Sequence, residues 1–443
     1  MSKGVHCDRG DKCPLSTVNA RFYLILTDFL NSMIEQIDCF GGSVMSSYQE
    51  IMSFVEEEDV KFIRLAFVDV AGTQKNISIM PDELKRAFKY GISFDASSIK
   101  GFGDVVQSDL FLRPDPSTLE ILPWRPAQGR VVRMFCDIFN PDGTPFMLDS
   151  RRILREAVSK AKEKGLTCYF GTEFEFYLFR RDEDGNPTKI PFDTAGYMDI
   201  APEDKGENVR REICFSLLDM DIVPESSHHE EGPGQNEIDF KYSDALSSAD
   251  NAVTFTSVVR SIANVNGLYA EFSPKPLPGE SGNGLHINMS VRSSDGKDYS
   301  KPYMAGIMSH IREMTAFLNP CDESYKRLGE KKAPKYVTWS HQNRSQLFRI
   351  PAAENEYKRM ELRSPDPMAN PYIAFALLIY AGLDGIEKNL ELPEPVDKNL
   401  FTADREVTKD LELLPQSYAQ ALEIAGKSEF IRKILPEGLL TEY

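Results

Sequence analysis

Two glutamates in one alternating segment are the first residues of this chain that point to chemistry. In CYFGTEFEFYLF, residues 168–179, polar and apolar side chains alternate, which predicts a strand with Glu173 and Glu175 on one face and Phe174 and Phe176 on the other. By strand geometry the two carboxylates lie about 7 Å apart, where they repel each other unless a cation lies between them. The spacing therefore predicts a cation site on this face.

Three further segments alternate between apolar residues and residues suited to chemistry. They are NEIDFKY (236–242), GLHINMSV (284–291) and YKRMELRS (357–364), and their polar faces carry Glu237, Asp239 and Lys241, then His286, Asn288 and Ser290, then Arg359, Glu361 and Arg363. A sheet with one face in water gives a similar alternation, but such faces usually carry Thr, Lys and mixed polar residues. Glutamate, histidine, asparagine and arginine are the residues that bind metals and phosphates. We therefore predict a curved sheet or open barrel whose polar face lines a site.

More carboxylates come from SHHEEGPGQNEIDF, residues 227–240, whose first part is predicted to be a Gly/Pro-rich loop. The candidate metal ligands are Glu173, Glu175, Glu230, Glu237, Glu361 and one histidine. Hard oxygen ligands with a single imidazole favour Mg²⁺ or Mn²⁺ and disfavour a closed structural zinc site. Because Mg²⁺ keeps several of its waters, a set of this size predicts two or three ions.

Arginines accompany these carboxylates. NRSQLFRIP supplies Arg344 and Arg349, while Arg359 and Arg363 flank Glu361. The guanidinium fork binds phosphate and carboxylate bidentately, which lysine cannot do. Divalent cations beside arginines are typical of phosphoryl transfer, where charge neutralisation carries most of the catalysis. The sequence has no GxxxxGK[ST] or GxGxxG motif to hold a nucleotide, and no GxSxG motif for a serine nucleophile.

Composition limits the partners and the compartment. The net charge of −17 and the pI near 5.0 argue against nucleic acid or an anionic membrane as a partner. The seven cysteines are scattered and never form CxxC, which favours a reducing cytosol. Since no apolar run reaches membrane-spanning length and no signal peptide is evident, we expect a cytoplasmic protein.

The chain divides into three predicted regions. Residues 1–44 form an atypical extension without periodicity, in which the spacing of the histidine and cysteines matches no standard metal site; a start at Met45 is the alternative. Residues 45–142 are predicted to be a small α+β domain, with a helix followed by two strands joined at a Gly turn. Residues 143–443 are predicted to be a larger α+β domain that opens with a helix capped at Asp149 or Ser150.

The order of the motifs resembles that of bacterial type I glutamine synthetase. The motifs are FDASSI (94–99), PDGTPF (141–146), GTEFEF (171–176), SHHEEGPGQNEIDF, SGNGLHINMS (281–290), SYKRL (324–328), NRSQLFRIP (343–351) and ELRSPDPMANPY (361–372). The resemblance extends from about Met45 to the end of the chain. It implies an α+β fold with a small N-terminal β-grasp domain, followed by a larger catalytic domain in which a curved antiparallel sheet lines the active site. It also implies the ligation of ammonia to glutamate with ATP, through γ-glutamyl phosphate, giving glutamine, ADP and phosphate.

The resemblance also implies a role for each candidate site residue. Glu175, Glu230 and Glu237 would hold the metal that faces glutamate, and Glu173, His286 and Glu361 the metal that bridges the ATP phosphates. Arg344, Arg349 and Arg359 would stabilise the transferring phosphoryl group, Arg327 and Arg363 would bind the amino-acid carboxylates, and the Gly282 backbone would contact the substrate amino group. Asp95 and Tyr197 match ammonium-site residues, and Tyr242, Asn288 and Ser290 align with the nucleotide pocket. Of the remaining residues in 227–240, His228 and His229 would orient ligands, Glu231 would be solvated, and Asp239 would support a ligand or the fold.

Three features depart from the family pattern. The family's mobile flap carries a glutamate before Ala-Pro, whereas this chain has Lys332 there in the shorter GEKKAP, with Glu330 as the candidate substitute. The family's Asn-Gly-Ser-Gly before the metal histidine is Ser-Gly-Asn-Gly here. The chain also ends at LLTEY, where relatives continue into a tail.

These departures keep two rival functions open: ligation of glutamate to an amine or polyamine, and a non-catalytic regulatory role. Asp95 and Tyr197 favour ammonia, since an Asp and a Tyr suit an ammonium ion, whereas the altered flap favours an amine. A non-catalytic relative would be expected to have lost metal ligands or phosphate arginines, and this sequence retains them. The resemblance therefore predicts a glutamate–ammonia ligase.

The resemblance further predicts a homo-oligomer with shared active sites. Asp95 would reach the ammonium site from a neighbouring subunit of a hexameric ring. In relatives the C-terminal tail joins two rings into a dodecamer, so we expect either a dodecamer or a hexamer here.

Regulation by adenylylation is predicted to be absent. Adenylylated relatives carry a tyrosine in a loop after a DKNL-type stretch, but DKNLFTADREVTKDLELLP, residues 397–415, contains none. We expect intact mass and peptide mapping to find no AMP adduct in this loop. An adduct mapped to residues 397–415 would contradict the prediction.

Overall fold

The computed structural model describes residues 43–103, 105–353 and 358–443. The predicted extension, with its histidine and cysteines, lies outside the described residues except for its last two positions. Internal contacts divide the chain into a unit of residues 1–57 and a unit of residues 58–443. In the first unit the structure describes helix α2 (Ser43–Glu57), which confirms the helix predicted from SSYQEIMSFVEEEDV.

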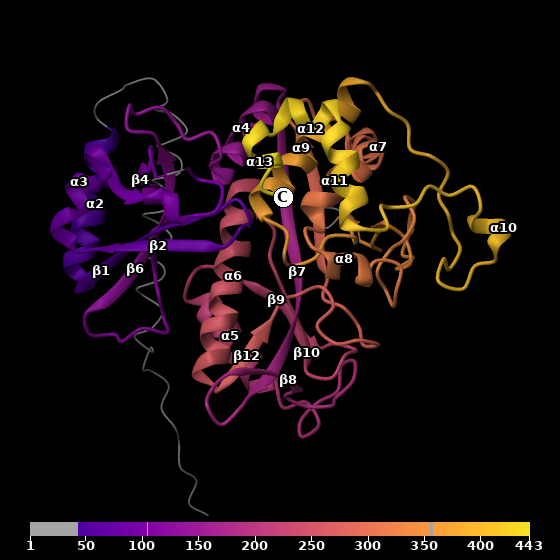
Figure 1. Ribbon diagram of the computed structural model, residues 1–443, viewed down its shortest axis with the longest axis horizontal. Coiled ribbons are helices and arrows are strands. Elements are labelled where there is room, and N and C mark those ends of the chain that lie inside the picture. The colour runs from indigo at the N-terminus through magenta and orange to yellow at the C-terminus, as the bar shows by residue number, and fades with distance from the viewer. Residues whose placement is uncertain (1–42, 104, 354–357) are drawn as a thin grey trace, which may run out of the picture. The chain divides into compact units, whose positions relative to one another are not determined.

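A six-stranded sheet opens the second unit (Figure 1). Its strands are β1 (Val60–Val68), β2 (Gln74–Ile79), β3 (Ile92–Asp95), β4 (Asp109–Pro114), β5 (Glu120–Ile121) and β6 (Arg130–Phe139). The order is β2-β1-β6-β4-β3, with β5 paired to β6, and β6 runs parallel to β1. The short helices η1 (Pro81–Glu83), α3 (Leu84–Tyr90), η2 (Ala96–Ser98) and η3 (Pro116–Thr118) connect the strands.

The turn between β1 and β2 requires glycine. Gly72 has φ +81°, a left-handed conformation that glycine adopts without a steric penalty. A Cβ atom there would lie 2.8 Å from the Cα of Asn370, whose side-chain amide donates a 3.2 Å hydrogen bond to the Val70 carbonyl. Gly72 therefore lets this turn approach the start of helix α9 (Pro371–Glu387). The predicted strand–Gly turn–strand arrangement is confirmed.

A ten-stranded sheet forms the centre of the larger domain, and the 16-residue strand β7 (Leu166–Arg181) is its hub (Figure 1). The other strands are β8 (Pro187–Pro191), β9 (Pro224–His229), β10 (Gln235–Phe240), β11 (Ser243–Asp244), β12 (Leu268–Glu271), β13 (Leu285–Ser293), β14 (Trp339–His341), β15 (Phe348–Ile350) and β16 (Met360–Leu362). The main order is β14-β15-β16-β13-β7-β10-β9, while β8, β11 and β12 also pair with β7. The expected antiparallel pairing holds for the other pairs, but β14 and β15 run parallel.

The two faces of β7 differ as the alternation predicted. Phe170 stacks on Phe375 of α9, with ring centroids 4.4 Å apart, and Phe174 stacks on Phe255, with centroids 4.9 Å apart. Phe255 belongs to helix α6 (Ala245–Val265), so one face of β7 packs against helices. The opposite face carries the carboxylates, since side chains alternate along a strand. Burial of the aromatic face therefore fixes the direction in which the carboxylates point.

Helices α6 and α9 pack against the apolar face of β7. The other helices described in this domain are α4 (Ser150–Glu163), α5 (Glu207–Leu218), α7 (Ser300–Leu318), α8 (Asp322–Arg327), α10 (Arg405–Thr408), α11 (Tyr418–Lys427), α12 (Glu429–Ile434) and α13 (Glu437–Leu440). The α4 prediction is confirmed: Asp149 accepts hydrogen bonds from the backbone N–H groups of Arg151 and Arg152, and Gly165 follows the helix at φ +71°. Among the described residues, no helix is both long and apolar enough to cross a membrane.

Strand ends differ from the sequence expectation in three places. His228 and His229 were expected in a loop but lie in β9, which pairs with β10. β10 ends at Phe240, so Lys241 and Tyr242 follow the strand. The strand expected over 357–364 is reduced to Met360–Leu362. In each case cross-strand pairing, which a single sequence does not reveal, decides where the strand ends.

Candidate active site

Three neighbouring strands bring Glu173, His286 and Glu361 together. β13 lies between β7 and β16, with His286 opposite Glu173 and Asn288 opposite Glu361. One ligand atom of each of Glu173, His286 and Glu361 lies within 4.8 Å of the others. The His286 Nδ1 atom is 3.3 Å from Glu173 and 4.0 Å from Glu361. This group has the donor set and the spacing of a divalent-cation site.

A second group, rich in carboxylates, adjoins the first through His286. Glu237 lies opposite Glu175 on the neighbouring strand, and these two with His286 form another group within 4.8 Å. Glu237 also forms such a group with Glu230 and His228. The six residues predicted as metal ligands therefore meet on one polar face of the sheet.

Burial and mutual repulsion raise the pKa values of this second group. Burial raises the pKa of Glu237 well above its usual value, and the hydrogen bond from His228 only partly opposes this. Burial also raises the pKa of Glu230, and the nearby Glu175 carboxylate adds to the effect. A divalent cation relieves such repulsion between carboxylates. The electrostatics of the donor set therefore fit a metal.

Glu173 is held as a carboxylate by its neighbours. Burial acts to raise its pKa, but hydrogen bonds from His286 and Asn288 outweigh burial and lower the pKa of Glu173 to about 2. The Asn288 amide donates to Glu173 across 2.7 Å. Glu173 therefore presents a charged, oriented oxygen to the group that it forms with His286 and Glu361.

Arginines border the carboxylates as predicted. Glu361 is fully buried and accepts hydrogen bonds from both Arg349 and Arg363. The Arg359 Nε atom donates to the side-chain Oδ1 atom of Asn288 across 2.9 Å. Arg344 lies close by in sequence, after β14, but its side chain is exposed.

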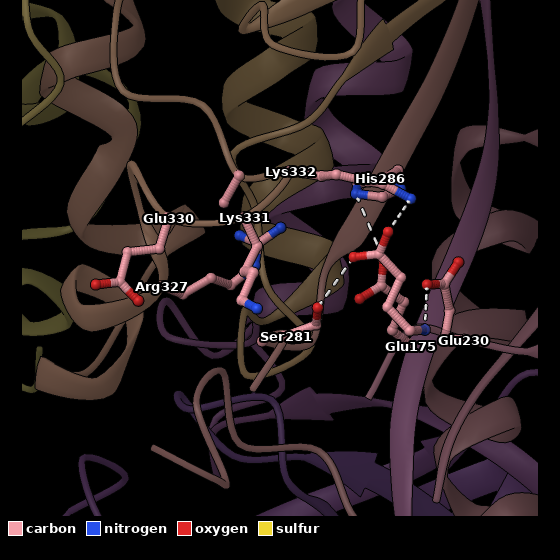
Figure 2. Close-up of a pocket in the computed structure, with 11 residues that line it drawn as sticks. Glu175, Glu230, Ser281, His286, Arg327, Glu330, Lys331 and Lys332 are labelled. Carbon is pink, nitrogen blue, oxygen red and sulfur yellow. Dashed lines mark hydrogen bonds and ion pairs between the residues drawn. The ribbon is translucent and has the colours of Figure 1, made fainter. Parts of the chain in front are cut away.

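An open cavity of about 330 Å³ lies beside the second carboxylate group (Figure 2). Its lining includes Glu175, Glu230, Glu231, Ser281, Gly282, His286, Arg327, Glu330, Lys331, Lys332 and Ala333. Buried Arg327 donates to the backbone carbonyls of Ser364 and Arg363. A Cβ atom at Gly282 would lie 2.4 Å from the Pro274 carbonyl oxygen, so only glycine fits there. The predicted glutamate-binding residues Gly282 and Arg327 thus share this cavity with the carboxylates.

A second open cavity, of about 610 Å³, has Glu173 in its lining. It is lined by Tyr169, Gly171, Thr172, Glu173, Glu225, Asp239, Phe240, Tyr242, Asn288, Met289, Ser290, Lys358 and Arg359. The predicted nucleotide residues Tyr242, Asn288, Ser290 and Arg359 are therefore brought together. The two cavities flank the proposed metal ligands.

Seven of the predicted residues line neither cavity, namely Glu237, Glu361, Arg344, Arg349, Arg363, Tyr197 and Asp95, and the last two also lie apart from the carboxylate groups. Tyr197 is exposed and lies edge-on to His228, with ring centroids 5.4 Å apart. Asp95 ends β3 in the small sheet, where it is exposed and accepts hydrogen bonds from the Ser97 backbone (2.9 Å) and hydroxyl (2.6 Å). Both side chains are accessible on the surface of the described chain.

The flanking histidines have different surroundings. His228 lies 3.4 Å from Glu237, consistent with an orienting role. The hydrogen bond to Glu237 raises the pKa of His228 to about 9, against the effect of burial. His229 is fully buried and contacts Asp193 across 2.8 Å, so it supports the fold behind the carboxylates. Glu231 is exposed, as expected, and it also accepts a hydrogen bond from Ser281 (3.2 Å) and pairs with Lys332 (2.7 Å).

Two further residues of the site were not predicted from the sequence, although the alternation of side chains along a strand points to both. Gln235 precedes Glu237 by two positions, is buried, and donates from its side-chain amide to Glu175 (3.1 Å) and to the Gly282 carbonyl (3.1 Å). Tyr169 precedes Glu173 by four positions and lines the second cavity. Extending the polar faces of β10 and β7 toward the N-terminus identifies both.

Comparisons with known proteins place the chain in a family. The family model for the glutamine synthetase β-grasp domain matches residues 59–141, and the model for the glutamine synthetase catalytic domain matches residues 147–443. A glutamine synthetase of Clostridium saccharobutylicum is 44% identical over 410 residues, covering 89% of this chain and 93% of the relative. One of Methanosarcina mazei is 44% identical over 411 residues, covering 89% and 92%.

Solved structures agree in fold. The structure described as the GmaS/ADP complex has a TM-score of 0.80 at 28% identity and covers 88% of this chain and 93% of that one. A Plasmodium falciparum glutamine synthetase has a TM-score of 0.79 at 24% identity, covers 89% and 94%, and shows the shared fold alone. With two family models matching both sheets and relatives 44% identical over most of its length, the chain belongs to the glutamine synthetase family.

Proposed function

We propose that this protein is a glutamate–ammonia ligase, which joins ammonia to the γ-carboxylate of glutamate with ATP and releases glutamine, ADP and phosphate. The observation that carries the proposal is the group of Glu173, His286 and Glu361 between the two cavities. It is the arrangement needed to transfer a phosphoryl group from a nucleotide on one side to an amino acid on the other.

Two or three Mg²⁺ or Mn²⁺ ions fit the carboxylate groups. Glu173, His286 and Glu361 would hold the ion beside the ATP phosphates, and Glu175, Glu230 and Glu237 the ion or ions beside glutamate. The family implies both ATP and a divalent metal. Such ions neutralise charge on the transferring phosphoryl group.

The arginines and the cavity walls supply the remaining roles. Arg344, Arg349 and Arg359 stabilise the phosphoryl group, Arg327, Arg363 and the Gly282 backbone bind glutamate, and Tyr242, Asn288 and Ser290 bind ATP. The support is their position: Arg349 and Arg363 contact Glu361, while Gly282 and Arg327 line one cavity and Asn288 and Arg359 the other. Burial of Arg327 and Arg363 suits them to a desolvated carboxylate.

Assembly follows from where Asp95 lies. Its carboxylate is exposed at the end of β3 and lines neither cavity of its own chain, which supports a role in another subunit's site. We propose that a neighbouring subunit supplies it, in a hexameric ring or a dodecamer of two rings. Light scattering over a dilution series distinguishes these forms, and a fully active monomer would contradict shared sites.

The nitrogen compound that accepts the glutamyl group distinguishes a glutamate–ammonia ligase from an amine ligase. We expect phosphate release with glutamate, ATP and Mg²⁺ to be fastest with ammonium, and putrescine and ethylamine to give little. The relatives from Clostridium saccharobutylicum and Methanosarcina mazei, each 44% identical to this chain, are glutamine synthetases, so an amine ligase is not favoured. Faster turnover with putrescine or ethylamine than with ammonium would overturn the assignment.

A further inference from the structure

Residues 329–335, called the flap segment below, form one wall of the glutamate-side cavity. The segment turns tightly: the Glu330 N–H donates to the Arg327 carbonyl (3.1 Å), and the Ala333 N–H donates to the Glu330 carbonyl (3.0 Å). Lys331 has φ +50°, a left-handed conformation that non-glycine residues rarely adopt. The turn sends its two outer charged side chains, Glu330 and Lys332, toward different parts of the protein.

Glu330 anchors one side of the flap segment, away from the metal ligands. Its carboxylate is 3.0 Å from the Lys275 ammonium, which is itself buried and donates to the Glu280 carbonyl (2.8 Å). Figure 2 shows the Glu330 carboxylate at the far side of the cavity from Glu175 and Glu230. Glu330 is therefore placed to hold the flap segment and not to act at the carboxylate groups.

Lys332 reaches the acidic wall of the same cavity. Its Nζ atom lies 2.7 Å from Glu231 Oε1 and 4.8 Å from the ring centroid of Tyr197. The other Glu231 oxygen accepts the hydrogen bond from Ser281, so the carboxylate is held in place from its far side. A carboxylate and an aromatic face together bind an ammonium group well. The contact joins the flap segment to the loop between β9 and β10, in which Glu231 follows the predicted metal ligand Glu230.

We propose that Lys332 and Glu231 form a latch that holds the flap segment across the cavity and so protects the acyl phosphate from water. The inference rests on the proposed function and extends it to residues with no assigned role. With the latch open, a water oxygen bonds to the γ-carbonyl carbon of γ-glutamyl phosphate, and the bond from that carbon to the phosphate oxygen breaks. Glutamate and phosphate leave, so ATP is consumed without glutamine. Lys332 acts through the flap segment and is a positioning residue.

The solvent exposure of the Lys332–Glu231 ion pair sets how strongly its loss should affect closure of the flap segment. The side chains of Lys332 and Glu231 are 43% and 35% exposed, and partly exposed ion pairs shift an equilibrium by about two- to fivefold. A lysine-to-glutamate change is expected to act more strongly, because it places like charges together. We therefore expect ATP hydrolysis to become uncoupled from glutamine formation by degrees across these variants, while the enzyme still turns over ATP.

The first test compares phosphate released with glutamine formed. The wild type is expected to give a ratio slightly above one, Lys332→Gln an excess over one that is about two- to fivefold larger, and Lys332→Glu a larger excess still. Lys332→Arg and the exchanged pair Lys332→Glu with Glu231→Lys should return the ratio toward one. Lys335→Gln is the control, since it makes the same change at an exposed position of the same segment. Equal ratios in Lys332→Gln and wild type, or an equal rise in Lys335→Gln, would overturn the latch.

The second test does not depend on turnover. Backbone amides of residues 331–333 should exchange with deuterium about two- to fivefold faster in Lys332→Gln than in the wild type or Lys335→Gln, and the exchanged pair should restore slow exchange. If no acceptor yields glutamine but the exchange pattern appears, the proposed function fails and the latch contact stands. If glutamine forms at a ratio of one in every variant and exchange is unchanged, the latch fails and the proposed function stands.

Discussion

Replacing Glu173 by alanine is expected to lower turnover by about a hundredfold or more, because charge neutralisation by a bound metal is worth several kcal/mol in phosphoryl transfer. Glu173 contributes an oriented, ionised oxygen to the group with His286 and Glu361. Its side chain is partly exposed, so the fold should survive its loss. Steady-state rates at saturating ATP, glutamate and ammonium, with circular dichroism as a check on folding, measure the effect.

Glu183→Ala is the matched control for this experiment. Glu183 follows the same strand, is exposed, and lines neither cavity, so the same change there should leave the rate within about twofold. Isothermal titration with Mn²⁺ separates lost metal binding from other causes. A folded Glu173→Ala enzyme with near-normal turnover would show that Glu173 is not a metal ligand.

Replacing Glu361 by alanine is expected to destabilise the protein by about 3–5 kcal/mol, because it leaves buried guanidinium groups without their counter-ion. Glu361 is fully buried and pairs with both Arg349 and Arg363, and the Arg363 side chain is only 1% exposed. For Glu361→Ala we expect a lower midpoint of urea denaturation and a lower yield of soluble protein. Glu361→Gln keeps the side-chain volume and one hydrogen-bond acceptor, so its loss of stability should be smaller.

Exposed ion pairs provide the comparison for Glu361. Glu412 pairs with Arg312 at the surface, with exposed fractions of 57% and 36%, so Glu412→Ala should cost no more than about 1 kcal/mol. Equilibrium urea unfolding of the three variants under identical conditions gives the ranking. Equal midpoints for Glu361→Ala and Glu412→Ala would contradict the view that Glu361 neutralises the arginines.

Strand periodicity explains why so much of the site could be predicted from sequence. Once Phe174 packs on a helix, Glu173 and Glu175 must point to the opposite face. The same rule placed Glu237, His286 and Glu361 on polar faces, and antiparallel register then brought those faces together. The β-grasp and catalytic domains followed from the family resemblance, since periodicity alone does not specify strand order.

Contacts between segments distant in sequence could not be predicted in this way. The pairing of Lys332 with Glu231 and of His229 with Asp193 depends on loops whose paths have no periodic signal. Sequence suggested Glu330 as the substitute for the family's flap glutamate, whereas the structure places its carboxylate on Lys275. The short strand Met360–Leu362 also ends where pairing ends and not where the alternation does.

The most direct test of the central claim follows oxygen from glutamate. Purified protein is incubated with ATP, Mg²⁺, ammonium and glutamate labelled with ¹⁸O in its γ-carboxylate, and the released phosphate is analysed by mass spectrometry. Ligation through γ-glutamyl phosphate transfers one labelled oxygen to each phosphate and forms one glutamine for each ADP. Unlabelled phosphate, or ADP formed without glutamine when ammonium is saturating, would contradict the account.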